Sequence, residues 1–185
     1  RGNDTYIVDN AADSVSECLN KGIDTAKCSV TYTLTANVEN LVLTGAAAIA
    51  GSGNSLNNAI TGNTADNILS GGGGADTLRG GAGNDSLLGG LGGDTYVYNP
   101  GDGNDLIVEI DSAAGDMDML VFGSGIAVQD LTVTRSGADS NDGAQLDPAT
   151  TVATELDAVG YQTSYVGKYL NGYRAFPPDR RDPPG

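Results

Sequence analysis

The sequence has 185 residues, enough for one ordinary domain or two small ones. It holds 24 acidic and 9 basic residues and no His, and its formal net charge is −15. This charge argues against binding to nucleic acid or to an anionic membrane surface, and it favours a bound cation. The lack of His excludes His-based catalysis and His-ligated zinc, and no apolar run reaches the roughly 18 residues of a membrane-spanning helix.

The first part of the chain, residues 1–52, predicts β-structure. Residues 2–8 (GNDTYIV) are similar to residues 92–98 (GGDTYVY), so we expect the end of a preceding repeat, in a piece of a longer protein. Val30, Tyr32 and Leu34 alternate with threonines, which predicts a strand with one buried face. A second strand is predicted within residues 37–45, and Ile49 is expected to point inward. Residues 1–52 are thus predicted to be a repeat end followed by a β spacer.

Cys18 and Cys28 are the two cysteines of the chain. Their spacing excludes a C-x-x-C redox or zinc site. A local disulfide is feasible if the protein is exported, and two unrelated thiols are the alternative.

Residues 53–97 divide into five consecutive blocks of nine: GNSLNNAIT, GNTADNILS, GGGGADTLR, GGAGNDSLL and GGLGGDTYV. A side chain with an oxygen donor stands sixth in each block, and a large apolar side chain stands eighth. The sixth residues are Asn58, Asn67, Asp76, Asp85 and Asp94, and the eighth are Ile60, Leu69, Leu78, Leu87 and Tyr96.

Nine residues are too few to bury a core, so each block must stack on its neighbours. The residues around position eight can form a short strand with the apolar side chain inside, while glycines allow the sharp turn before it. The acidic side chain then faces a loop rich in carbonyls, and such oxygen ligands suit calcium. The alternatives are a Gly-rich linker, which would not keep the nine-residue apolar period, and a phosphate loop, which would need a Lys that is absent.

The last three blocks fit the pattern G-G-x-G-x-D-x-U-x, where U is a large apolar residue, and this stretch resembles the hemolysin-type (RTX) calcium-binding repeats. The resemblance implies a flattened right-handed parallel β-roll with two blocks per turn. It also implies Ca²⁺ between loops on the same edge, with ligand residues eighteen apart and Asn57 and Asp66 assisting. The implied metal-site residues are Asn58, Asn67, Gly72, Gly74, Asp76, Gly81, Gly83, Asp85, Gly90, Gly92, Asp94, Gly101, Gly103 and Asp105.

The nine-residue period slips by two residues after Val97, and residues 101–107 then restore the motif. We therefore expect a widened turn at residues 98–99 and a weaker calcium site at Asp105. Strands are predicted at residues 118–122 and 131–134, in a segment that looks like the cap of an RTX array. Residues 53–109 are thus predicted to be the calcium-binding β-roll, and residues 110–147 a β-rich cap.

The tail, residues 148–185, is predicted to hold a helix that begins at Pro148 and a strand over residues 161–166, as in α/β proteins. Residues 151–173 resemble an early segment of type I sulfatases, which implies that Lys168 contacts a sulfate group. A surface Lys on an ordinary α/β remnant is the alternative. The nucleophile motif and the metal ligands of sulfatases are absent from the sequence.

The predicted fold class is all-β: a parallel β-roll (β-solenoid) with β-rich flanks and a short α/β-like tail. The predicted function is Ca²⁺ binding without catalysis. The RTX resemblance implies a secreted, extracellular or cell-surface bacterial protein that leaves through a type I secretion apparatus and folds on calcium after export. An internal fragment of a secreted sulfatase and an adhesin-like repeat array are the alternatives.

Overall fold

The computed structural model describes residues 2–19, 22–108 and 117–127 of the chain. Every regular element in these residues is a β-strand, and every strand pair is parallel, which confirms the predicted fold class. One sheet holds seven strands in the order β1-β2-β4-β6-β8-β10-β12, and the other holds five in the order β11-β9-β7-β5-β3. The strands are β1 (Thr5–Val8), β2 (Thr25–Cys28), β3 (Tyr32–Thr33), β4 (Asn40–Leu43), β5 (Ala50–Ser52), β6 (Ala59–Thr61), β7 (Ile68–Gly73), β8 (Thr77–Arg79), β9 (Ser86–Leu91), β10 (Thr95–Tyr98), β11 (Leu106–Val108) and β12 (Met119–Phe122).

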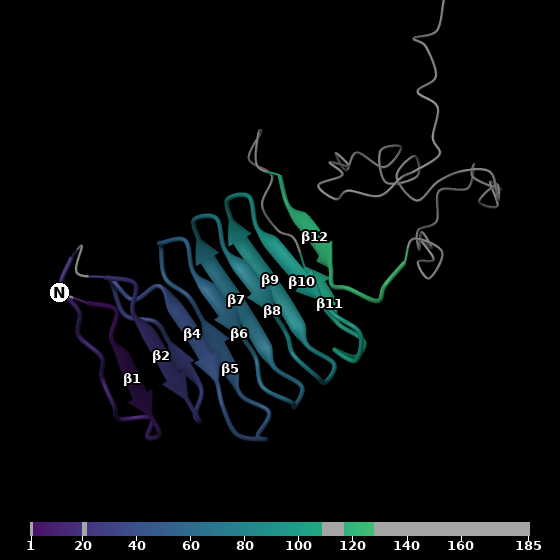
Figure 1. The fold of residues 1–185 in the computed structure, drawn as a ribbon. Helices are drawn as coiled ribbons and strands as arrows, with labels where there is room; N and C mark the ends of the chain where they lie inside the picture. The colour runs from purple at the N-terminus through teal and green to yellow at the C-terminus, as the bar shows by residue number, and fades with distance from the viewer. Residues whose placement is uncertain (1, 20–21, 109–116, 128–185) are drawn as a thin grey trace, which may run out of the picture. The chain divides into compact units, whose positions relative to one another are not determined.

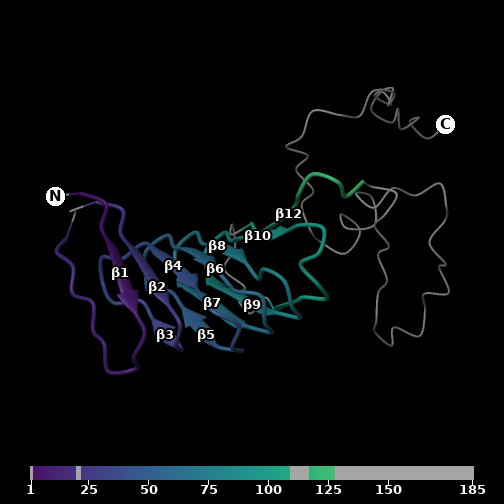
Figure 2. The same ribbon diagram turned by 60° about the horizontal axis from the view of Figure 1, so that its bottom comes forward.

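From β2 onward the chain alternates between the two sheets, as Figure 1 shows for the successive strands of the repeats. Figure 2 separates the sheets into two rows, with β4, β6, β8 and β10 in one and β3, β5, β7 and β9 in the other. The register pairs Ile60 with Leu78 in one sheet and Leu69 with Leu87 in the other. Each repeat therefore stacks on the repeat two before it, as predicted for two blocks per turn.

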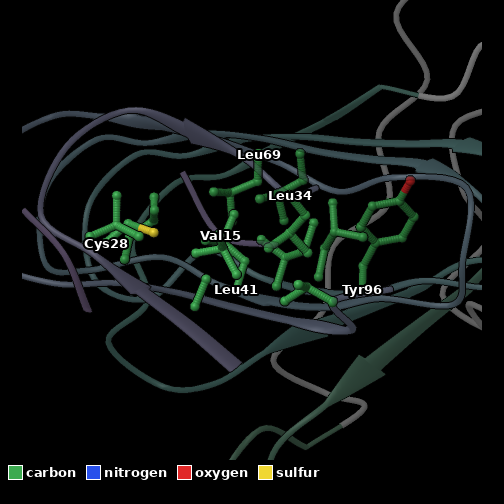
Figure 3. Close-up of a cluster of buried hydrophobic side chains, with 13 residues drawn as sticks. Val15, Cys28, Leu34, Leu41, Leu69 and Tyr96 are labelled. Atoms are coloured by element: carbon green, nitrogen blue, oxygen red, sulfur yellow. The ribbon is translucent and has the colours of Figure 1, made fainter. Parts of the chain in front are cut away.

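The core lies between the sheets, and in the repeats it is formed by the apolar residues of position eight. Ile60, Leu69, Leu78, Leu87 and Tyr96 are all at most 2% exposed, which confirms the prediction that they point inward. Figure 3 shows Leu69, Leu41 and Tyr96 in this cluster. Burial of such a side chain contributes about 1.5–3 kcal/mol, so the nine-residue apolar period is the main source of stability for these rungs.

Residues before the repeats extend the same two sheets. Strand β4 pairs with β6, and β3 pairs with β5. The strand predicted around residues 30–34 is short, with Tyr32–Thr33 paired and Leu34 buried just beyond it. Strand β4 lies within the predicted residues 37–45, and Ile49 packs against the core as expected.

The two cysteines are free thiols, so the disulfide considered from the sequence does not form in this structure. Cys18 is exposed, whereas Cys28 is buried on β2, where burial raises the pKa of its thiol to about 11. Cys28 therefore acts as a small core residue.

The two-residue slip after Val97 is taken up by a turn in which the Asp102 N–H donates to the Asn99 carbonyl (3.1 Å). The predicted strand at residues 118–122 is present as β12, which pairs with β10. The strand predicted at residues 131–134 and the α/β tail lie outside the described residues. Within the described part of the chain, no helix is long and apolar enough to cross a membrane.

Candidate metal centre

The sixth residue of each repeat stands directly before a strand, at the end of a loop. Loops that lead into one sheet lie along one edge of the roll, and loops that lead into the other sheet lie along the other edge, so these residues form two ladders. The first ladder consists of Asn58, Asp76, Asp94 and Asp118, which stand before β6, β8, β10 and β12. The second ladder consists of Asn67, Asp85 and Asp105, which stand before β7, β9 and β11.

Each ladder is held together by hydrogen bonds from a backbone N–H to the carboxylate of the next rung. Asp76 Oδ1 accepts from the Asn58 N–H (2.7 Å), and Asp94 Oδ1 accepts from the Asp76 N–H (2.8 Å). On the second ladder, Asp85 Oδ1 accepts from the Asn67 N–H (2.7 Å). The structure thus brings together residues that are eighteen apart, as the RTX resemblance implied: Asn58 with Asp76, Asn67 with Asp85, and Asp76 with Asp94.

The second carboxylate oxygen of two rungs is buried without a donor. Oδ2 of Asp76 and Oδ2 of Asp85 have no hydrogen-bond partner among the described residues, although both side chains are at most 2% exposed. A buried carboxylate oxygen without a partner is costly, and native proteins normally satisfy such atoms. A cation is the ligand that would satisfy them.

The first glycine of each of these blocks lets the carboxylate pack directly against the backbone. A Cβ on Gly71 would overlap Asp76 Oδ2, and a Cβ on Gly80 would overlap Asp85 Oδ2. A side chain at either position would therefore displace the carboxylate from its place in the ladder.

Backbone carbonyls supply the remaining oxygen atoms near the loops. Gly72 and Gly81 have φ angles of +105° and +97°, and each lies against the carbonyl of an asparagine in the loop below. Of the other predicted metal-site glycines, Gly74, Gly83, Gly90, Gly92 and Gly103 also lie against loop carbonyls, whereas nothing lies within 4 Å of a Cβ built on Gly101. Carboxylates and carbonyls together form an all-oxygen donor set, which fits a hard cation such as Ca²⁺.

Without a bound cation, burial and mutual repulsion disfavour the ionised form of these carboxylates and so raise their pKa values. Burial raises the pKa of Asp76 to about 6, with a further contribution from the charge of Asp94, while the hydrogen bond from Asn58 opposes the shift. Burial also raises the pKa of Asp85, as do the charges of Asp105, Asp66 and Asp102, against the hydrogen bond from Asn67. The pKa of Asp105 is raised chiefly by burial.

These shifts predict opposite pH dependences with and without calcium. The usual pKa of Asp76 is 3.8, so the calcium-free fold binds a proton that the unfolded chain has released between about pH 4 and 6, and its stability falls as pH rises through this window. With calcium, protons compete with the ion, and stability rises with pH over the same window. Thermal unfolding at pH 5 and pH 7, in chelator and in about 10 mM calcium, measures both trends. Equal signs in the two buffers would contradict the prediction.

The first two blocks use asparagine amides where the later blocks have carboxylates. The Asn58 Nδ2 donates to the Glu39 carbonyl (3.1 Å), and the Asn67 Nδ2 donates to the Ile49 carbonyl (3.0 Å). An amide nitrogen therefore satisfies carbonyls of the rung below without an ion. That Asn58 and Asn67 are also metal ligands stays a prediction.

Asn54 and Asn63, which were not singled out from the sequence, have the same role at position two. The Asn54 Nδ2 donates to the carbonyls of Thr35 and Val38 (both 2.8 Å), and the Asn63 Nδ2 donates to the Ala47 carbonyl (2.9 Å). The signal was the change from Asn to Gly at position two between the second and third blocks.

Residues one place earlier form an outer row of hydrogen bonds. Asn57 Oδ1 accepts from the Ala75 N–H (2.9 Å), and Asp66 Oδ1 accepts from the Asn84 N–H (2.8 Å). Both bonds are exposed, so this row connects the loops at their surface.

The first ladder extends beyond the repeats in both directions. Asp118 Oδ1 accepts from the Asp94 N–H (2.8 Å), although Asp118 follows it by 24 residues. At the other end, Glu39 precedes β4, Asp24 precedes β2 and Asp4 precedes β1. The similarity of residues 2–8 to residues 92–98 places Asp4 at the sixth position, but the nine-residue period missed Asp24, Glu39 and Asp118 because the connections between their strands are irregular in length. The signal that could have found them is an acidic residue directly before a strand.

The close approach of Gly80 to the Asp85 carboxylate gives a testable contrast. We expect Gly80→Ala to weaken calcium binding by roughly 10-fold or more and to lower stability in calcium, because the new Cβ would overlap Asp85 Oδ2 and displace this carboxylate. Gly73→Ala is the matched control, since nothing lies within 4 Å of a Cβ at that position. Calorimetric titration of both variants with calcium compares them, and equal affinities would show that the position of the Asp85 carboxylate does not matter for calcium binding.

The fold and the ladders define a class of protein: a parallel β-solenoid whose repeated loops present carboxylates and carbonyls to a cation. Residues 61–96 match the family model for the RTX calcium-binding nonapeptide repeat, in four copies. This stretch of the chain therefore belongs to the RTX calcium-binding repeats. Such repeats bind Ca²⁺, so calcium is the ion for this part of the protein.

No curated protein matches the chain. The family that matches is a calcium-binding repeat and not a catalytic one. The sulfatase resemblance of residues 148–185, including Lys168, lies outside the described residues, and the comparisons give it no support.

Proposed function

We propose that the loops of the two ladders bind calcium through their aspartates and neighbouring carbonyls, and that calcium completes folding of the β-roll. The observation that carries the proposal is the pair of buried oxygens, Asp76 Oδ2 and Asp85 Oδ2, which have no hydrogen-bond partner among the described residues. The hydrogen bond from the Asp76 N–H to Asp94 Oδ1 shows that the loops of successive turns are adjacent. An ion bound at Asp76 would therefore lie between one loop and the loop one turn away.

The dependence of folding on calcium follows from the charges. Without an ion, Asp85 faces the charges of Asp105, Asp66 and Asp102, so the closed loops carry unfavourable repulsion. An ion that binds the folded loops and not the unfolded chain shifts the equilibrium toward the fold by mass action. The repeats are thus expected to be poorly folded at cytosolic calcium and folded at millimolar calcium, where extracellular modules have affinities of roughly 10⁻⁴–10⁻³ M.

The same proposal includes the cellular setting. The protein leaves a bacterial cell through a type I secretion apparatus and folds outside the cell. Support comes from the family, which is typical of secreted proteins, and from the expected difference in calcium between the two compartments.

Far-ultraviolet circular dichroism across micromolar to roughly 10 mM calcium tests the folding step. We expect β-sheet signal to rise with calcium and magnesium to be far less effective, because Mg²⁺ demands a stricter octahedral geometry and gives up water reluctantly. A spectrum that is unchanged by calcium contradicts calcium-driven folding.

A further inference from the structure

A cluster of three carboxylates lies outside the nonapeptide repeats, beside the first two strands. Asp4 ends the segment before β1, Asp24 ends the segment before β2, and Glu17 comes from the connection between these strands. One carboxylate oxygen of each residue lies within 4.8 Å of the other two. A group of acidic side chains is not by itself a metal site. The burial and the hydrogen bonds of each carboxylate must therefore be considered.

Asp24 has the same arrangement as the aspartates of the repeats. Its side chain is 1% exposed, and its Oδ1 accepts from the Asp4 N–H of the neighbouring rung (2.8 Å). Its Oδ2 is buried and has no hydrogen-bond partner among the described residues, as for Asp76 and Asp85. A buried oxygen of this kind, within a group of carboxylates, is unfavourable unless a cation satisfies it.

Glu17 is held in place by its surroundings. Its Oε1 accepts from the Cys18 N–H (2.7 Å), its Oε2 accepts from the Tyr6 hydroxyl, and its backbone carbonyl accepts from the Asn37 Nδ2 (3.0 Å). These contacts fix the carboxylate beside the first ladder. Two of the three carboxylates, Glu17 and Asp24, are therefore positioned by hydrogen bonds, while the Asp4 side chain is exposed.

The loops around the cluster also repeat the backbone stacking of the calcium loops. The triplets Gly2-Asn3-Asp4 and Gly22-Ile23-Asp24 correspond to positions four to six of a nonapeptide. A Cβ on Gly22 would meet the Gly2 carbonyl, just as a Cβ on Gly92 would meet the Gly74 carbonyl. The Ile23 N–H also donates to Asn3 Oδ1 (3.0 Å), which holds the two loops in register.

We propose that Asp4, Glu17 and Asp24 form an additional divalent-cation site, of the calcium class, which lies outside the nonapeptide array. The donor set is entirely oxygen, which selects a hard cation. Unlike a repeat site, it takes a third carboxylate from the connection between two strands. An ion there would bind this connection to the start of the roll and so stabilise β1, whose described pairing is with β2 alone.

The test is calcium titration of the full chain with Glu17→Gln, which removes one charge and keeps the size of the side chain. Isothermal titration calorimetry is expected to find one fewer calcium ion per chain than in the unmodified protein. Asp9→Asn is the matched control, since it removes one exposed acidic charge from the same connection, and we expect its stoichiometry to be unchanged. An unchanged stoichiometry in Glu17→Gln overturns the proposal.

Hydrogen exchange gives a second, local measurement of calcium binding, which is needed if Glu17→Gln disturbs local folding. In the unmodified protein, calcium is expected to protect amides of residues 2–19 and of the repeats. In Glu17→Gln and in Asp24→Asn, protection of the repeats should remain while the gain over residues 2–19 is lost. A gain over residues 2–19 that survives both substitutions overturns this site. Loss of calcium protection in the repeats of the unmodified protein would instead contradict the proposed function, so the two failures can be told apart.

Discussion

Removing calcium is expected to lower the thermal unfolding midpoint of the β-roll by at least ~15 °C. Three ladder pairs, Asn58 with Asp76, Asn67 with Asp85 and Asp76 with Asp94, are brought together by the fold. At 10 mM calcium and affinities of roughly 10⁻⁴–10⁻³ M, each occupied site stabilises the fold by about 1.4–2.7 kcal/mol. Three such sites would supply roughly 4–8 kcal/mol, which is comparable to the whole stability of an ordinary domain.

The measurement is differential scanning calorimetry of the full chain in a calcium chelator and in about 10 mM calcium. Magnesium at the same concentration is the control for ionic strength, because general screening of the net charge of −15 would act with either ion. A midpoint that rises equally with magnesium and calcium would show that screening, and not specific binding, stabilises the loops.

The nine-residue period was sufficient to predict the stacked strands and their core, because both follow from local pattern. Leu78 and Leu87 are buried since each rung must cover the apolar residue of the next. The extension of the sheets through β1 and β2 could not be predicted in the same way. The connections from β1 to β2 and from β2 to β4 differ in length from those of the repeats, and the pairing of these strands is decided by long-range register.

The candidate site was predictable to the level of residue type and spacing, but not of hydrogen bonding. The RTX resemblance implied that Asn58 and Asp76, eighteen residues apart, are partners in one site. The structure shows that the Asn58 amide donates to carbonyls of the rung below, whereas Asp76 Oδ2 has no donor among the described residues. Amide and carboxylate have similar shapes, so only the positions of the surrounding carbonyls distinguish a rung that satisfies itself from a rung that needs an ion.

This distinction predicts that Asp85→Asn changes stability in opposite directions with and without calcium. In chelator, the substitution removes a buried carboxylate near Asp105 and Asp66, so we expect unfolding to require more denaturant than in the unmodified protein. In about 10 mM calcium, the variant loses the ion held by that carboxylate, and its stability is expected to be lower by about 1.4–2.7 kcal/mol. Denaturant unfolding in the two buffers measures both effects.

Asp66→Asn is the matched control for charge. Asp66 lies on the same edge, and its Oδ1 also accepts a backbone N–H, from Asn84 (2.8 Å), but its side chain is exposed. The Asp66→Asn substitution therefore removes one of the charges that repel Asp85 without removing a buried ligand, and we expect the stability in calcium to change by less than about 0.5 kcal/mol. If Asp85→Asn and Asp66→Asn lower the stability in calcium equally, the exposed row binds the ion as strongly as the buried ladder. If Asp85→Asn destabilises the protein in chelator as well, the carboxylate stabilises the loop through its hydrogen bond to Asn67 and not through an ion.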